Sequence, residues 1–245
     1  MTFAEALRDR RTRRHLSQLD LAVRAQTTQR HVSFLESGRS TPGRAMVIRL
    51  AESLDLPLRE RNDLLLAAGF AAAYPRTPLD DPALAPVRTA LDHILTGHLP
   101  YPALIADRYG DLVAANAALD VLITAKPGDN VYRLALHPDG MAPRIGNLPE
   151  WSRHIVERIR YELQRNPDDR LAALLTELTG YVPDLPLPPD HLGFAVPLRL
   201  RTARGELRLM TTVTTFATAL DVTIAELKLE AFLPADPRTA ALLAD

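Results

Sequence analysis

The chain has 245 residues, 47% of them hydrophobic, a formal net charge of −1 and no cysteine, so it is long enough for two domains but offers neither a disulfide framework nor a thiolate metal site. No apolar run approaches the roughly 18 residues that a membrane-spanning helix needs, and the first residues lack the apolar core of a signal peptide. We therefore expect a cytoplasmic protein with no membrane partner.

Residues 17–38 read SQLDLAVRAQTTQRHVSFLESG, a pattern typical of two short helices joined by a tight turn. Ala25 and Gln26 are expected to form the turn. Thr28 is positioned to cap the second helix, because its hydroxyl can accept a hydrogen bond from the first turn. Gly38 stands where that helix should end in a left-handed residue. The apolar residues expected to pack inside are Leu19, Leu21, Ala22, Val32 and Leu35.

The outer face at the start of the second helix carries Gln29, Arg30 and Ser33. Glutamine and arginine can each form two hydrogen bonds to a base edge, so a helix with this face fits the major groove of DNA. The same residues would also suit an ordinary solvated helix face. Charge favours DNA binding: residues 1–70 contain 12 arginines and 8 acidic residues, a balance of +4, whereas residues 71–245 have a balance of −5.

Further residues in this region carry a resemblance to a known family: Ser17, Gln18, Leu21, Ala22, Thr27, Thr28, Gln29, Leu35, Glu36, Gly38 and Arg39. Residues 3–70 resemble the helix-turn-helix domain of the phage repressor and Cro type, also called the XRE type. The resemblance implies a five-helix DNA-binding domain with its fourth helix at residues 41–56, and the amphipathic pattern of residues 60–69 predicts the fifth helix. It also implies a buried ion pair between Arg11 and Glu36 that links the first helix to the recognition helix.

The predicted DNA-contacting residues are Gln18, Thr28, Gln29, Arg30, Ser33, Phe34 and Arg39. We expect Arg30 to read a guanine, Gln29 to contact an adenine or a phosphate, and Gln18 to hold a phosphate. Two positions depart from the family pattern. Gln26 replaces a turn glycine, so the turn must hold a side chain in a left-handed conformation at a small cost. Phe34 replaces a residue that is often polar, so reading there would use apolar contact with a thymine methyl group.

The chain changes character near Phe70. Residues 71–86 contain four prolines and are typical of an interdomain connector. We therefore predict a DNA-binding domain at residues 1–72, a linker at 73–86 and a second domain at 87–245.

The second domain alternates between helical and strand patterns. Two β-favouring runs around residues 109–111 predict a hairpin, after which Asn116 is positioned to cap a helix. Residues 151–166 predict a helix with an apolar stripe at four-residue spacing: Trp151, Ile155, Ile159 and Leu163. Period-two alternation after the proline-rich residues 181–191 predicts three more antiparallel strands. The predicted fold class is therefore α plus α/β: a five-helix repressor-like domain joined to a PAS-like antiparallel sheet with covering helices.

Five segments of the chain carry a second resemblance: residues 58–70, 100–118, 130–145, 150–160 and 213–236. Together with the first domain, they resemble an XRE-type domain followed by the ligand-binding domain of MmyB-like transcription regulators. The resemblance implies a transcriptional regulator whose PAS-like domain binds a small apolar or acyl-chain ligand.

Small hydroxyl side chains beside large apolar ones at the sheet centre predict a cavity rather than a filled core. The predicted ligand-contacting residues are Arg133, Arg144, Trp151, Ile155, Phe194, Met210, Thr212, Thr214 and Phe216. Thr212 and Thr214 would share one strand face, and Trp151 would close one end. Arg133 and Arg144 flank the HPDG segment (residues 137–140) and could meet an acidic head group. The simpler interpretation is that the apolar members form an ordinary core and the arginines lie in solvent.

The chain offers little for catalysis. Its seven histidines form no HExxH or comparable metal pair, and the sequence contains no GxSxG, phosphate loop or paired-carboxylate motif. We expect no enzymatic activity, no cofactor and no bound metal. Residues 136–143 (LHPDGMAP) are typical of a turn, with a pocket lid as the alternative.

The sequence predicts a DNA-binding transcription regulator, and we expect a repressor. One helix-turn-helix reads only a few base pairs, so we expect a homodimer on near-palindromic double-stranded DNA, with dimer contacts mainly in the second domain and around Val87–Leu95. The expected effector is a small apolar or fatty-acyl ligand. The alternative is a PAS-like dimerisation domain that binds no small molecule and is controlled by a partner protein. A buried cavity would favour the first interpretation and a filled core the second.

Overall fold

The structure is a computed structural model that describes residues 1–183, 196–216 and 218–244. These residues form two compact units. The first consists of residues 1–77, 164–166 and 218–225, and the second of the other described residues. No helix within the described ranges is long and apolar enough to cross a membrane.

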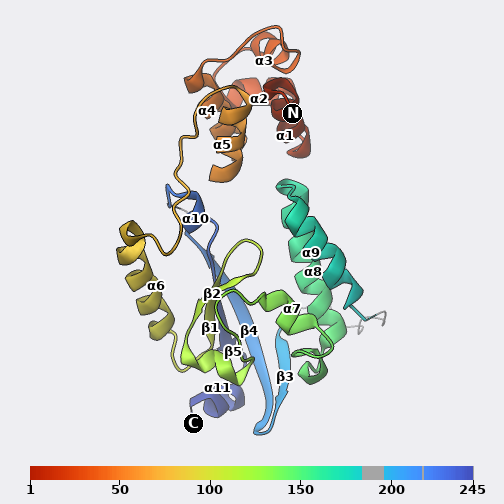
Figure 1. The fold of residues 1–245 in the computed structure, drawn as a ribbon. Coiled ribbons are helices and arrows are strands. Elements are labelled where there is room, and N and C mark those ends of the chain that lie inside the picture. The colour runs from red at the N-terminus through yellow and green to blue at the C-terminus, as the bar shows by residue number, and fades with distance from the viewer. Residues whose placement is uncertain (184–195, 217, 245) are drawn as a thin grey trace. The chain divides into compact units, whose positions relative to one another are not determined.

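The N-terminal part of the first unit contains five short helices (Figure 1), as the sequence predicts. Their bounds are α1 (Phe3–Arg13), α2 (Gln18–Arg24), α3 (Gln29–Glu36), α4 (Arg44–Ser53) and α5 (Leu58–Ala67). One leucine from each helix is fully buried in a shared core: Leu7, Leu21, Leu35, Leu50 and Leu64. These helices are too short to be stable alone, so this shared apolar core holds the unit together.

The ends of α2 and α3 follow the expected capping chemistry. Ser17 and Asp20 form a reciprocal capping box at the start of α2, and the Thr28 hydroxyl accepts a hydrogen bond from the His31 amide at 3.1 Å. Gly38 has a φ of +71° just beyond α3, as its position predicts. Gln26 has a φ of +50°, so the turn does hold its side chain in the left-handed region.

One apolar position in α2 was wrongly predicted. Leu19 is 54% exposed, whereas Leu21 and Ala22 are buried. α2 has only seven residues, about two turns, and Leu21 and Ala22 fill its core-facing positions. Leu19 is therefore left on the exposed side of the helix.

The second unit is built on a five-stranded antiparallel sheet in the order β2-β1-β5-β4-β3. The strands are β1 (Ala103–Ala106), β2 (Leu112–Ala115), β3 (Leu198–Thr202), β4 (Gly205–Thr215) and β5 (Lys228–Pro234). The α-helices of the C-terminal half are α6 (Ala85–Gly97), α7 (Val131–Leu136), α8 (Leu148–Arg165), α9 (Asp169–Gly180), α10 (Val222–Ala225) and α11 (Pro237–Ala244). Three short 3₁₀ helices join them: η1 (Pro82–Leu84), η2 (Ala117–Val121) and η3 (Ala142–Arg144). The predicted fold class is confirmed.

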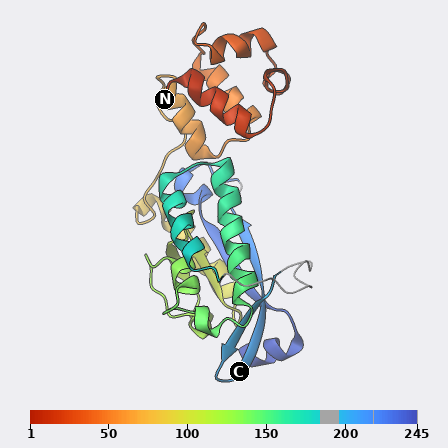
Figure 2. The ribbon, with the colours of Figure 1, turned by 90° about the vertical axis from the view of Figure 1, so that its right-hand side faces the viewer.

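Helices cover both faces of this sheet (Figures 1 and 2). Leu91 and Leu95 of α6 pack with Leu229 of β5 on one face. On the other face, Trp151 of α8 belongs to the same apolar cluster as Phe232 of β5. Neighbouring side chains of a strand point to opposite faces, so both sets of side chains on the central strand β5 are covered.

Asn116 does not cap the following helix as predicted, although it precedes η2. Its side-chain oxygen accepts a hydrogen bond from the Ala103 amide at 3.0 Å, and its amide donates to the carbonyls of Leu95 and Tyr101. Asn116 is only 9% exposed. Its buried amide therefore joins α6 to β1, where buried backbone groups need partners.

Candidate functional site

The outer side of α3 is available to a partner. Thr28, Gln29 and Arg30 are exposed, while Ser33 and Phe34 are half-buried. The Arg30 guanidinium lies 5.2 Å from the centre of the Phe34 ring, a cation–π distance. Arg30 and Phe34 therefore present a charged and an apolar group side by side on the helix face predicted to meet DNA.

Gln18 is held from within the unit. Its side-chain amide donates a 2.8 Å hydrogen bond to Glu36 Oε2, and Glu36 also pairs with Arg11. A phosphate contact through the Gln18 amide would have to compete with this bond. Arg39 is exposed just beyond α3, and its backbone amide donates to the Phe34 carbonyl at 2.9 Å. Because this hydrogen bond fixes the backbone of Arg39, its exposed positive charge stays close to the end of α3.

The predicted pair between Arg11 and Glu36 is confirmed. Arg11 Nε and NH2 donate to the two carboxylate oxygens of Glu36 at 2.6 and 2.9 Å. The side chains are 10% and 3% exposed, so the pair is buried. The hydrogen bond with Glu36 raises the pKa of Arg11. The pair fixes α3 against α1 and thus sets the direction of the DNA-facing helix.

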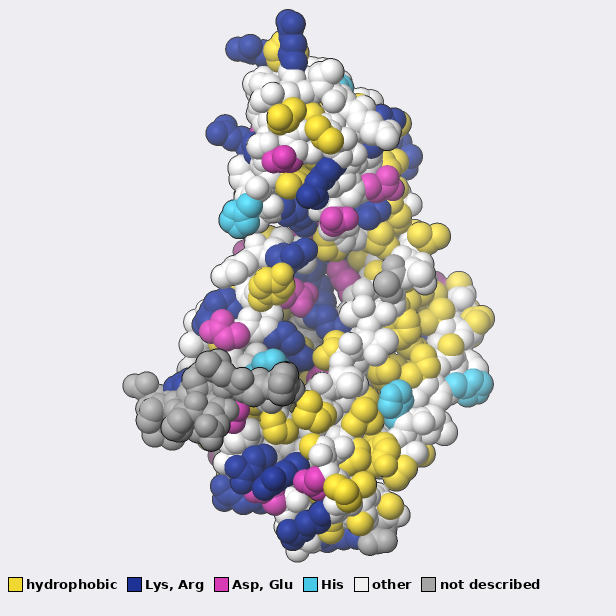
Figure 3. Space-filling view, turned by 180° about the vertical axis from the view of Figure 1, so that it is seen from behind, with side chains coloured by type: hydrophobic (Ala, Val, Ile, Leu, Met, Phe, Trp, Pro, Cys, Tyr) yellow, Lys and Arg dark blue, Asp and Glu magenta, His cyan; other side chains and the backbone are white. Residues whose placement is uncertain are grey.

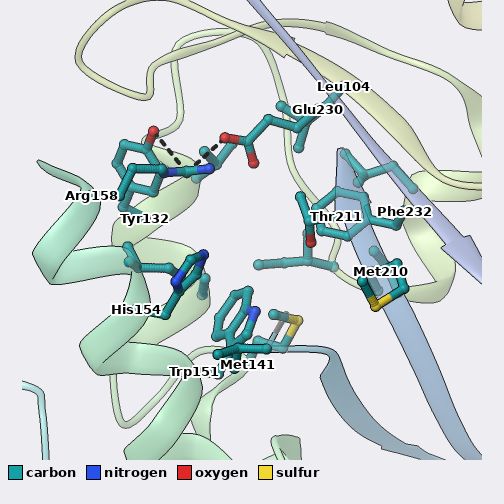
Figure 4. A pocket seen from close by; sticks show the side chains of 17 residues that line it. Leu104, Tyr132, Met141, Trp151, His154, Arg158, Met210, Thr211, Glu230 and Phe232 are labelled. Carbon is teal, nitrogen blue, oxygen red and sulfur yellow. Dashed lines mark hydrogen bonds and ion pairs between the residues drawn. The ribbon is translucent and has the colours of Figure 1, made fainter. Parts of the chain in front are cut away.

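The second unit contains a cavity of about 270 Å³ between α8 and the sheet (Figure 4). Its wall is mostly apolar and is formed by Leu104, Leu119, Leu122, Ile123, Val131, Tyr132, Ala135, Met141, Trp151, His154, Ile155, Arg158, Val196, Met210, Thr211, Glu230 and Phe232. A concave apolar wall with a few convergent polar groups is the usual form of a small-molecule site.

Three polar side chains of the cavity form one connected network. Arg158 of α8 donates to Glu230 Oε1 of β5 at 2.8 Å and to the Tyr132 hydroxyl at 3.3 Å. Glu230 is only 7% exposed. Burial alone would lower the pKa of Arg158, but the Glu230 carboxylate and the Tyr132 hydroxyl raise it above its usual value. The pKa of Tyr132 is also raised, chiefly by burial, so its phenol stays neutral.

Two further polar side chains face this cavity. His154 lines it and is also exposed to solvent, and burial followed by the charge of Arg158 lowers its pKa. The Thr211 hydroxyl oxygen is fully buried, and within the described residues it has no hydrogen-bond partner. Figure 4 shows this hydroxyl directed into the cavity. Since buried hydroxyls almost always form a hydrogen bond, a ligand in the cavity could supply the partner that the Thr211 hydroxyl lacks.

The structure brings together three of the nine residues predicted to contact a ligand. Trp151 and Ile155, one helical turn apart on α8, both line the cavity, and Met210 of β4 does so as well. Phe194 lies outside the described residues. Contact between a ligand and these residues stays a prediction.

Thr212, Thr214 and Phe216 were assigned to the wrong face of the sheet. Thr212 pairs with Ala231 and Thr214 with Leu229, both of which belong to the cluster under α6. Phe216 packs against that same cluster. Directly opposed residues share a face, so these three side chains lie on the α6 side, and Thr211 faces the cavity instead. An error of one residue exchanges the two faces of a strand.

Arg133 and Arg144 do not line the cavity either. Arg133 forms a bidentate ion pair with Glu177 of α9, with its NH2 at 2.7 Å from Oε2, and its side chain is 49% exposed. Arg144 donates to the Leu122 carbonyl and lies in a separate hollow beside Arg201 and Arg204. The predicted contact of these two arginines with a head group in this cavity is therefore wrong.

Sequence reasoning missed Arg158, Glu230, Tyr132, His154 and Thr211. Arg158 could have been found, because it lies three and seven residues after Ile155 and Trp151 on the same helical stripe. Glu230 gave a weaker signal, because it follows Glu226 and Lys228 at period two and so resembles the solvent-facing side of β5. The HPDG segment forms the predicted turn, with the Gly140 amide donating to the His137 carbonyl at 2.8 Å.

No cluster of three or more potential metal-binding His, Cys, Asp or Glu side chains occurs in the part of the chain that the structure describes.

Two matches to family models show which family the two sites belong to. Residues 87–245 match the MmyB-like transcription regulator ligand binding domain, and residues 7–61 match the helix-turn-helix family. A search of curated proteins gave no match. The helix-turn-helix contains the exposed face of α3, and the ligand-binding domain contains the cavity. The chain belongs to the MmyB-like family and is a DNA-binding transcription regulator.

Proposed function

We propose that this regulator is a repressor and that its second domain senses a small apolar or acyl-type ligand. The observation that carries the proposal is the cavity of about 270 Å³, with an apolar wall and the Arg158–Glu230 network at one side. Its volume is just below the roughly 300–1,000 Å³ usual for ligand sites, which favours a small ligand. A domain that only dimerised would have no need for this internal space.

We propose that the regulator binds a near-palindromic operator as a homodimer, in the cytoplasm where the chromosome is accessible. A single α3 reads only a few base pairs, whereas two copies about one helical turn apart read enough for specific binding. A ligand that fits only one arrangement of α8 and the sheet would shift the protein toward that arrangement. The shift in operator affinity cannot exceed the difference in ligand affinity between the two states.

The sensor proposal is tested by filling the cavity. Thr211→Leu adds an apolar side chain inside it, whereas the matched control Thr214→Leu makes the same change on the α6 side of the same strand. Trp151 is the only tryptophan of the chain and lines the cavity, so its fluorescence reports ligand entry. We expect Thr211→Leu to weaken binding of ten-carbon acyl compounds by about tenfold or more, and Thr214→Leu to leave it unchanged.

Operator binding without ligand should survive in both variants, because neither changes the helix-turn-helix. Native mass spectrometry of protein purified from its own host adds a second readout, since retained ligand and subunit number appear in one spectrum. If the parent protein retains no small molecule and binds none of the acyl compounds, the dimerisation domain without a ligand replaces the sensor proposal.

A further inference from the structure

The charges at the polar side of the cavity are already balanced. Arg158 contributes one positive charge and Glu230 one negative charge, and the two are 2.8 Å apart. Tyr132 is a neutral phenol, and His154 is neutral at about pH 8, above its ordinary titration range. Among the residues that the structure describes, the ionisable side chains that line the cavity are these four. The described lining of the cavity therefore carries no net charge.

A carboxylate ligand would upset this balance. It would have to share the Arg158 guanidinium with Glu230, which leaves one uncompensated negative charge beside the buried Glu230 carboxylate. Glu230 lies on the central strand with its side chain 9% exposed, so solvent screens its charge less than that of Arg158, whose side chain is 32% exposed. Burying an unpaired charge is costly, whereas a buried group that only needs a hydrogen bond can be satisfied by a neutral guest.

A neutral polar group would find partners across the same space. The Thr211 hydroxyl has no partner among the described residues and can donate or accept. His154 faces the cavity from α8, opposite the sheet that carries Thr211 (Figure 4). A hydroxyl or carboxamide on the guest can bond to such groups without disturbing the Arg158–Glu230 pair.

We propose that the effector is a neutral amphiphile, an apolar chain that ends in a hydroxyl, carboxamide or similar uncharged group, and that the cavity discriminates against the carboxylate of a free fatty acid. This inference rests on the proposed sensor function, because it names the head-group class of the same site. Glu230 is the specificity-determining residue: its buried negative charge both holds Arg158 and repels an anionic head group.

The test compares three guests with equal carbon number: decanol, decanamide and decanoic acid. Binding to the full chain is followed by Trp151 fluorescence at about pH 8, where decanoic acid is ionised and His154 is neutral. We expect decanol or decanamide to bind at least about tenfold more tightly than decanoate. If decanoate binds as tightly as both neutral compounds or more tightly, the inference is overturned while the sensor function stands. If none of the three compounds binds, nor their eight- and twelve-carbon homologues, both proposals fail.

A second experiment uses Glu230→Gln to test whether the Glu230 charge sets the head-group preference. The substitution keeps the size of the side chain but leaves Arg158 without its counter-charge, so the cavity gains a net charge of +1. We expect the preference to reverse, with decanoate binding at least about tenfold more tightly to Glu230→Gln than to the parent. The matched control is Glu177→Gln, which makes the same chemical change at the Arg133 pair away from the cavity and should leave the preference unaltered. An unchanged preference in folded Glu230→Gln contradicts the role of Glu230. If that variant does not fold, the comparison of the three guests on the parent still decides the proposal.

Discussion

Arg11 and Glu36 are joined by two hydrogen bonds, from Nε to Oε1 at 2.6 Å and from NH2 to Oε2 at 2.9 Å. Glu36 Oε2 also accepts the Gln18 amide at 2.8 Å, and Arg11 NH1 donates to the Leu16 carbonyl at 2.6 Å. One buried carboxylate thus connects α1, α2 and α3. The helix that faces DNA is positioned by a polar network as well as by its apolar side.

Replacing Glu36 with glutamine should destabilise the first unit by about 3–5 kcal/mol, because it leaves the Arg11 charge buried without its counter-charge. The measurement is hydrogen exchange of the α1 and α3 amides in the full chain, which gives the free energy of opening that unit. Asp9→Asn is the matched control: it removes the exposed Arg13–Asp9 pair and should cost about 0–1 kcal/mol. Equal small losses in both variants would show that burial of the Arg11–Glu36 pair contributes little.

Arg30→Ala should weaken operator binding by about 1–3 kcal/mol and relax the sequence preference at one base position, since arginine binds guanine through two acceptors. The measurement is selection of binding sites from random DNA by the parent and the variant. Gln18→Ala serves for comparison, since we expect it to weaken all sequences alike through loss of a phosphate contact and of its bond to Glu36. An unchanged selected motif with Arg30→Ala contradicts the assigned role.

The protein should be a dimer at micromolar concentration, with and without DNA. Hydrophobic side chains are visible on the face of the second unit that carries α6 (Figure 3), and Val87 and Ile94 of α6 are only partly buried. Light scattering gives the mass in solution. Ala90→Glu places a charge on the exposed side of α6 and should shift the equilibrium toward monomer, while Glu157→Lys on the exposed side of α8 should not. A monomeric parent in both conditions would oppose the dimer proposal.

Gly110→Ala should destabilise the second unit more than Gly128→Ala does. Both glycines have positive φ values, +82° and +93°, so each alanine pays about 1–2 kcal/mol of backbone strain. A Cβ at Gly110 would also lie 2.4 Å from the Tyr132 ring, whereas a Cβ at Gly128 meets nothing within 4 Å. Thermal unfolding followed by Trp151 fluorescence checks the difference. Identical melting temperatures would mean that Tyr132 moves aside freely.

The helix-turn-helix could be predicted from the sequence because its signals are local. The Thr28 cap, Gly38 and the buried leucines lie within a few residues of the structure they specify. The Arg11–Glu36 pair joins positions 25 residues apart, and it was anticipated only through the family resemblance. Leu19 was misplaced because a helix of two turns leaves several apolar residues with no clear choice of face.

The cavity was harder to predict because its wall depends on which face of each strand is turned toward α8. Both faces of β4 carry threonines, namely Thr211, Thr212, Thr214 and Thr215. The two faces therefore do not differ in polarity, and the sequence does not indicate which one faces α8. In β5 both faces are covered, which hides Glu230 inside an apolar run. Arg133 and Arg144 flank a turn, which makes them candidates from the sequence, but Arg133 has Glu177, 44 residues later in the sequence, as its partner.

The central strand β5 separates the cavity from the apolar cluster that α6 covers, and its alternate residues face the two sides. Glu230 and Phe232 line the cavity, while Leu229 and Ala231 belong to the apolar cluster that α6 covers. A backbone shift that makes room for a guest at Glu230 must carry Ala231 with it, because the peptide bond between them is rigid. A guest that shifted the β5 backbone at Glu230 would therefore also shift residues that pack with α6. If α6 belongs to the dimer contact, only the sheet and α6 itself would separate the guest from the subunit boundary.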